Sequence, residues 1–166
     1  MKKLLAALVI TSMLLALSAC GSGSDKAKTA LEGYLQGIVD RDYEAAYEYL
    51  SDFDKDNISK EIFIQWRTDA AKVQSIKSFT ISSKADRFKN YKYLGTTLGD
   101  AFGFEVSQNI EKTIAGIDLE GYDSDSYHIL MVSGNKEWKV ALLMMDLDEQ
   151  VKSISKLIAE KEKAMQ

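Results

Sequence analysis

The segment YHILMVSGNKEWKVALLMM, residues 127–145, gives the strongest indication of the fold. Its two halves, Tyr127–Val132 and Trp138–Met145, are rich in residues that favour β-structure, and a polar connection around Gly134 separates them. Such a pair of runs predicts a β-hairpin. Both runs are apolar at nearly every position, which is typical of strands covered on both faces. We therefore expect this hairpin to lie centrally in a sheet.

Further β-patterned runs lie upstream of the hairpin. Residues Ile76–Ser83 and Phe88–Leu94 alternate loosely, and Ala101–Ser107 alternates clearly between apolar and polar positions. The glycines of Gly95–Gly99 indicate a turn between the second and third runs. Residues Asn109–Asp118 fit either a turn of helix or a continuing strand, and the pattern alone does not choose between them.

Helical patterns precede the strands. Apolar residues recur at steps of three and four along Lys26–Val39, which predicts an amphipathic helix. Asp42 is placed to cap a second helix that runs to Leu50, and Ser59 to cap a third over Lys60–Ala71. Between these two helices we expect an acidic loop over Ser51–Asn57.

The chain ends on a helical pattern after Asp146, with an apolar stripe formed by Val151, Ile154, Leu157 and Ile158. The tail beyond Ala159 is expected to fray. Helices followed by a run of antiparallel strands indicate the α+β class.

Two short motifs resemble a known family. The stretch Asp42-Tyr43-Glu44-Ala45-Ala46-Tyr47-Glu48-Tyr49-Leu50 resembles the second-helix signature of nuclear-transport-factor-2-like (NTF2-like) domains, and Glu137-Trp138-Lys139-Val140 resembles their closing strand. The nearest likeness is to the short exported versions on bacterial lipoproteins. The resemblance covers roughly Lys26 to Met145 and implies a cystatin-like α+β cone, in which N-terminal helices pack on a curved antiparallel sheet. The helix after Asp146 extends beyond that fold.

The N-terminus carries an export signal. Lys2 and Lys3 precede an apolar run from Leu4 to Leu17 of roughly 14 residues, shorter than the ~20 that a membrane-spanning helix needs. The run ends in Leu17-Ser18-Ala19-Cys20, which resembles the lipobox of bacterial lipoproteins. Cys20 is the only cysteine of the chain, so a disulfide within one chain is excluded and lipidation explains the thiol.

This resemblance sets the domain boundaries and the location. We expect a signal peptide over residues 1–19, a lipidated cysteine with a flexible tether over residues 20–25, an NTF2-like domain over residues 26–145 and a C-terminal helix over residues 146–166. Two acyl chains on Cys20 would anchor the protein stably on the extracytoplasmic face of a membrane. The residue after Cys20 is Gly21 rather than Asp, so an outer membrane is also possible if the cell has one.

The overall charge argues against a nucleic-acid partner. Removing the signal removes two lysines and leaves 19 basic and 25 acidic residues, a net charge of −6. Phosphate recognition needs a basic surface, and the same balance argues against broad adhesion to anionic lipid headgroups. The partners that remain are the membrane through Cys20, an envelope protein, or a small apolar ligand.

The residues offer few candidates for catalysis and none for a cofactor. His128 is the only histidine, so zinc clusters and Cys–His couples are excluded within one chain. It shares a strand face with Leu130 and Val132, and it is either a hydrogen-bonded structural residue or a general base in the cone. The chain contains no dinucleotide, Walker A or nucleophile-elbow motif.

Two acidic clusters raise a calcium hypothesis. Asp52, Asp54 and Asp56 have the first three ligand positions of an EF-hand loop, but Asn57 and Phe63 stand where its glycine and bidentate glutamate belong. The second cluster surrounds Gly121, with Asp118, Glu120, Asp123 and Asp125. Solvated loops explain both clusters better, and no metal site is expected.

The aromatic residues and His128 are either core or the lining of a pocket in the cone. The candidate pocket residues are Tyr34, Tyr47, Trp66, Phe102, Phe104, His128 and Trp138.

Three functional hypotheses follow from these patterns. The first is a non-catalytic binding or interaction module on a membrane. The second is an isomerase or dehydratase in which His128 or Asp40 meets a tyrosine in an open pocket. The third is a subunit of an envelope complex that docks through an exposed stripe on the C-terminal helix.

Overall fold

A computed structural model describes residues 23–93, 95–113, 124–132, 136–143 and 147–164. The predicted signal peptide, Cys20, the first residues of the predicted tether and residues 133–135 lie outside these ranges. So do residues 114–123, which include three of the four acidic residues around Gly121.

Five helices are described: α1 (Gly23–Asp40), α2 (Tyr43–Glu48), α3 (Asp52–Asn57), α4 (Lys60–Val73) and α5 (Leu147–Ala164). The predicted helices after Lys26, Asp42, Ser59 and Asp146 are therefore present. Helix α1 begins at Gly23, a few residues earlier than the tether boundary predicted. Helix α5 continues to Ala164, five residues beyond the point at which the sequence pattern predicts fraying.

Side-chain caps fix the starts of α2, α3 and α4. Asp42 accepts a hydrogen bond from the Ala45 amide at 3.0 Å, and Ser59 accepts one from the Ile62 amide at 3.3 Å. Ser51 caps α3 in the same way, with the Asp54 amide as donor. Each such cap stabilises a helix by about 1 kcal/mol. The loop predicted over Ser51–Asn57 is therefore wrong, because its serine and aspartate form a helix start.

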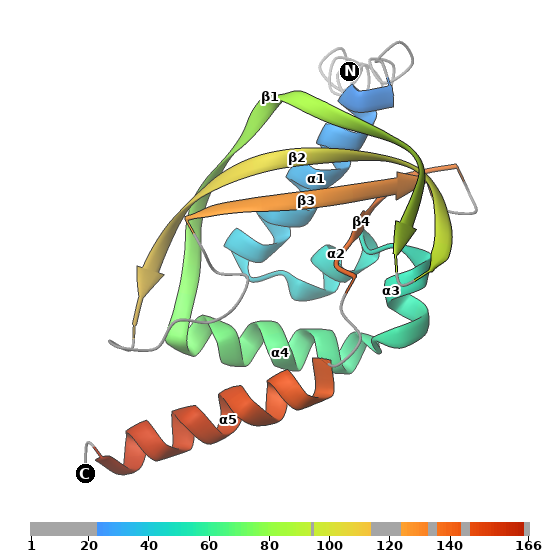
Figure 1. Ribbon diagram of the computed structural model, residues 1–166. Helices are drawn as coiled ribbons and strands as arrows, with labels where there is room; N and C mark the ends of the chain where they lie inside the picture. Colours follow the sequence, from blue (N-terminus) through green and yellow to red (C-terminus); the bar gives the residue numbers. More distant parts are fainter. Residues whose placement is uncertain (1–22, 94, 114–123, 133–135, 144–146, 165–166) are drawn as a thin grey trace, which may run out of the picture.

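The sheet has four antiparallel strands in the order β1-β2-β3-β4. They are β1 (Gln74–Tyr93), β2 (Thr96–Lys112), β3 (Asp125–Val132) and β4 (Trp138–Ala141). Together with the helices this confirms the α+β class, with a curved antiparallel sheet and a C-terminal helix (Figure 1).

The two runs predicted at 76–83 and 88–94 form one long strand, β1. Its pairing with β2 passes from Ile81–Val106 to Ala85–Phe104, so three residues of β1 face one residue of β2. A bulge of this kind interrupts the alternation without ending the strand. Of the ambiguous segment, residues 109–112 belong to strand β2.

The predicted hairpin is β3 paired with β4, and β3 lies inside the sheet. Strand β4 is last in the sheet, but its outer edge is covered because its Val140 amide donates to Tyr49 O and its Val140 carbonyl accepts from the Ser51 amide, both at 2.8 Å. The strand ends at Ala141 rather than Met145. The next two amides, of Leu142 and Leu143, donate to the buried Asp54 carboxylate instead of continuing the ladder.

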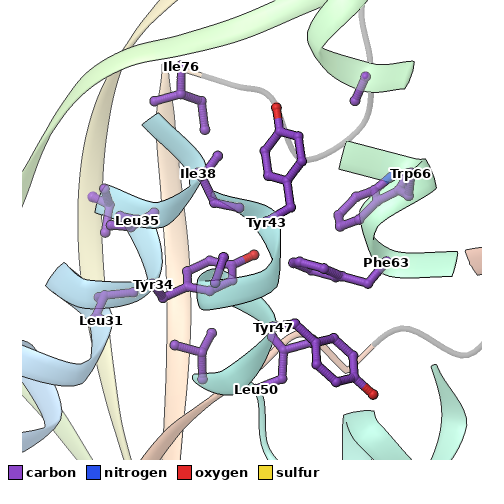
Figure 2. Close-up of a cluster of buried hydrophobic side chains, with 14 of the residues drawn as sticks. Leu31, Tyr34, Leu35, Ile38, Tyr43, Tyr47, Leu50, Phe63, Trp66 and Ile76 are labelled. Carbon is purple, nitrogen blue, oxygen red and sulfur yellow. The ribbon is translucent and has the colours of Figure 1, made fainter. Parts of the chain in front are cut away.

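The main core lies between α1, α2, α4 and one face of the sheet. Tyr34 of α1 points toward Phe63 of α4, and Leu31 and Leu35 of α1 and Trp66 of α4 belong to the same buried cluster (Figure 2). Phe104 and Leu130 close the cluster from the sheet side, and both are almost fully buried. Burying one such side chain contributes about 1.5–3 kcal/mol. The space between helices and sheet is filled by side chains here.

Helix α5 packs on α4, on the side away from the sheet (Figure 1). Leu147, Ile154 and Ile158 are buried in this contact, and Val151 and Leu157 are partly buried. The buried carboxylate of Asp69 in α4 accepts hydrogen bonds from Ser155 Oγ at 3.0 Å and Lys72 Nζ at 2.6 Å. The apolar stripe of α5 is thus used within the domain.

Candidate functional site

Polar side chains enter the main core where α1, α4, β2 and β3 meet. Arg67 follows Trp66 on the inner face of α4, and Gln108 continues the inward phase of Phe104 and Val106 on β2. Ser126 and His128 precede Leu130 on the inner face of β3, opposite Val106 and Phe104. With Tyr34 of α1 these residues form what we call the inner polar cluster: Tyr34, Arg67, Gln108, Ser126 and His128.

A hydrogen-bonded chain orients the histidine. Gln108 Nε2 donates to Ser126 Oγ at 2.6 Å, and that hydroxyl lies 3.1 Å from His128 Nε2. The Ser126 hydroxyl thus accepts from Gln108, and it also donates to the Val106 carbonyl at 3.5 Å. The Ser126 hydroxyl therefore bridges Gln108 and the imidazole of His128.

Arg67 is held by aromatic rings. Its guanidinium donates to the Tyr34 hydroxyl, and its Cζ lies 4.0 Å from the centre of the Trp66 ring and 5.6 Å from that of Phe63. The side chain is buried, so these cation–π contacts act in a low-dielectric setting and are stronger than at an exposed site. Figure 2 shows Tyr34 pointing from α1 toward the rings of α4.

The electrostatics of the cluster keep the histidine neutral. Burial, and to a lesser extent the nearby Arg67 charge, lower the pKa of His128 from its usual 6.5 to about 4. The imidazole also packs against Tyr34, with ring centroids 6.3 Å apart. A group with this pKa is a weak base, and near neutral pH it is not in the imidazolium form that a general acid needs.

The predicted pocket residues separate into three places. Tyr34 and His128 belong to the inner polar cluster, and the Trp66 ring packs against its Arg67. Phe104 is core, and Tyr47 packs on Phe63 and donates its hydroxyl to the Ile58 carbonyl at 2.9 Å. Phe102 and Trp138 form a separate, partly exposed pair with ring centroids 5.0 Å apart, beside the first residue of α1.

Sequence reasoning missed Arg67, Gln108 and Ser126. The signal was available, because Arg67 lies on the helix face marked by Phe63 and Ala70, and Gln108 and Ser126 occupy inward positions of alternating strands. A polar residue in phase with an apolar pattern indicates a buried polar group.

The carboxylates proposed for catalysis or calcium have other roles. Asp40 is exposed at the end of α1 and accepts a hydrogen bond from Gln36. Asp54 is fully buried and accepts from Ser51 Oγ and from two backbone amides after β4, so it joins α3 to the sheet. In the parts of the chain that the structure describes, no three His, Cys, Asp or Glu residues are grouped to hold a metal ion.

Three hollows among the described residues open to solvent. One of about 30 Å³ lies between the end of α1 and the start of β1, and one of about 240 Å³ lies between α3 and the ends of β2 and β3. A third, of about 440 Å³, is lined by residues 105–107 of β2 and 125–127 of β3, including the half-exposed Tyr127. The Tyr127 ring lies over Gly103, where an added Cβ would come within 2.0 Å of the phenol oxygen.

Comparisons of the chain with protein-family models, with curated proteins and with solved structures found no match. Within the described residues, no helix is both long and apolar enough to cross a membrane.

Proposed function

We propose that the chain is an extracytoplasmic lipoprotein, anchored by acyl chains on Cys20, whose NTF2-like domain is a non-catalytic interaction module. The lipobox at residues 17–20 supports the anchor. The observation that carries the non-catalytic assignment is the inner polar cluster, whose imidazole is neutral, bonded to Ser126 and packed on Tyr34.

The filled core favours a protein partner over a small apolar ligand. Tyr34, Phe63, Phe104 and Leu130 are almost fully buried and occupy the space in which a cone-shaped domain would hold a ligand. The three hollows described above are instead on the surface, where another protein could reach them. An envelope protein is therefore the partner that we propose.

The two other hypotheses receive less support. The enzyme hypothesis needs an open pocket in which a base meets an available tyrosine. His128 does face Tyr34, but Arg67 binds that hydroxyl and the ring is fully buried. Docking of a complex through the α5 stripe is not favoured, because Ile154 and Ile158 are buried against α4.

The anchor is tested by Cys20→Ala in the full chain, expressed in a bacterium that lipidates its own lipoproteins. We expect the variant to lose incorporation of labelled palmitate and to leave the membrane fraction. Ser24→Ala, which lies outside the lipobox, is the matched control and should remain in the membrane. The anchor proposal is wrong if Cys20→Ala stays in the membrane with its label.

A further inference from the structure

The first residue of α1 marks the end of the domain at which the chain would leave the membrane. A Cβ on Gly23 would lie 3.4 Å from the Phe102 ring and 3.7 Å from the Trp138 ring, so α1 begins directly on this aromatic pair. Cys20 is only three residues away, and three extended residues span at most about 11 Å. An anchor on Cys20 would therefore hold Phe102 and Trp138 close to the membrane surface.

Basic residues of β1 lie at the same end. Arg87 is the cross-strand partner of Phe102, so the two side chains project from the same face of the sheet. Lys84 and Lys89 lie on either side of Arg87 along β1, and both are exposed. The Arg87 side chain is 63% exposed, and its contact with Asp100 at 3.7 Å is a surface ion pair that contributes little.

The positive charge is concentrated in this strand. Strand β1 carries five basic residues and one acidic residue, a net of +4. The chain after residue 19 has a net charge of −6, so everything outside β1 carries −10. The acidic residue, Asp86, accepts a hydrogen bond from Tyr127 on the opposite face of the sheet from Phe102. One of the five, Lys77, is paired with Glu111 on β2 at 2.6 Å, and the three that lie nearest Phe102 in the β1–β2 register are Lys84, Arg87 and Lys89.

Lysines on an edge strand also prevent sheets from pairing between molecules, and β1 is the first strand of the sheet. That role does not depend on where the strand lies relative to the anchor. That role therefore does not explain why these basic residues lie beside the start of α1. Partly exposed aromatic rings next to Lys and Arg are typical of surfaces that contact the membrane interface.

We propose that Lys84, Arg87 and Lys89, together with Phe102 and Trp138, form an anchor-end surface that rests on anionic phospholipid headgroups. The proposal depends on the lipid anchor of the proposed function. It adds the orientation of the domain: β1 and the start of α1 face the bilayer, and α5 faces away from it.

The experiment uses the full lipidated chain, added to preformed phosphatidylcholine vesicles made with or without phosphatidylglycerol. A membrane-impermeant acylating reagent modifies exposed lysines, and mass spectrometry measures the extent at each site. We expect the reactivity of Lys84 and Lys89 to fall by about threefold or more when phosphatidylglycerol is present. Lys152 and Lys156 of α5 are the internal controls and should not change. High salt should restore the reactivity, because the Debye length falls to about 3 Å at 1 M.

Two charge-removal variants distinguish an effect of this surface from an effect of the net charge of the protein. In the unaltered chain we expect phosphatidylglycerol to protect Lys26 and Lys28, in the first turns of α1, as well. The triple variant Lys84→Gln, Arg87→Gln, Lys89→Gln should remove this protection. The variant Lys152→Gln, Lys156→Gln, Lys163→Gln removes the same charge from α5 and should leave that protection intact. Equal behaviour of the two variants would overturn the anchor-end surface.

The remaining outcomes of the vesicle experiment also test the proposal. A chain that does not float with either vesicle overturns the anchor and this surface together. A chain that floats but shows the same lysine reactivity on both lipids overturns the surface alone. Protection of Lys84 and Lys89 on both lipids that rises with protein density would show pairing of β1 with a second copy, which contradicts the headgroup proposal.

Discussion

His128 shows how one residue can couple the core to pH. Its pKa in the folded protein is about 4, below the usual 6.5, so the unfolded chain binds a proton that the folded protein does not. The contribution of the neutral His128 to the free energy of unfolding is complete above pH 6.5 and is lost as the pH falls through 4. A shift of this size corresponds to about 3 kcal/mol.

We therefore expect the free energy of unfolding, measured with urea, to fall steeply between pH 6.5 and 4. His128→Gln keeps a partner for Ser126 but does not titrate, and it should flatten this part of the profile. His128 is the only histidine, so its proton NMR signals can be followed without assignment. A titration midpoint near 6.5 would contradict the buried, neutral imidazole.

At the scale of single residues, the sequence predicts the positions of some buried residues and misses those of others. It places His128 on the face of Leu130, and it offers Tyr34 and Trp66 as neighbours in a pocket. It does not single out Arg67, because a lone arginine in an amphipathic helix usually reaches solvent. Only the packing of α1 against α4 brings the guanidinium over Trp66 and onto the Tyr34 hydroxyl.

Helix α5 depends on one polar contact within its apolar interface with α4. Ser155 donates to the buried Asp69 carboxylate, which also accepts from Gln65 and Lys72. Burial raises the pKa of Asp69, but these hydrogen bonds outweigh it and hold the pKa below its usual value. The ionised carboxylate thus fixes α5 against α4.

Ser155→Ala should destabilise the protein by about 1 kcal/mol, because it removes one hydrogen bond to a charged group that keeps two other donors. Hydrogen exchange measured by mass spectrometry should become faster in α5 and stay unchanged in the sheet. Ser153→Ala, on the exposed side of the same helix, is the control. If both variants loosen α5 equally, the contact with Asp69 does not dock the helix.

At the scale of secondary-structure elements, the spacing of apolar residues and the capping residues predict most of the helices and strands. Helices α1, α2 and α4 and the β3–β4 pairing follow from apolar spacing and from Asp42 and Ser59. The error at Ser51–Asn57 has a specific cause. Ser51 and Asp54 have the spacing of a capping box, yet Asp54 looked like a solvated acidic residue because its partners, Leu142 and Leu143, are distant in the sequence.

The whole molecule has two different ends. Helix α1 starts on Phe102 and Trp138, and α5 lies at the opposite end, outside α4 (Figure 1). Composition alone suggests a uniformly acidic domain. Residues 74–93 carry five basic residues, and the pairing of β1 at the start of the sheet places them along one edge, which the sequence alone does not predict.

This polarity can be measured with two single-cysteine labels. Cys20 is the only cysteine and would be acylated, so Lys26→Cys and Lys156→Cys each introduce the one free thiol. Both positions are exposed, the first six residues from Cys20 and the second on α5. With a donor dye on the thiol and acceptor dyes on the lipid headgroups, energy transfer should be strong from position 26 and weak from position 156. Equal transfer from the two positions would mean that α5 lies as close to the bilayer as α1 does, which would contradict an upright domain held at the anchor end.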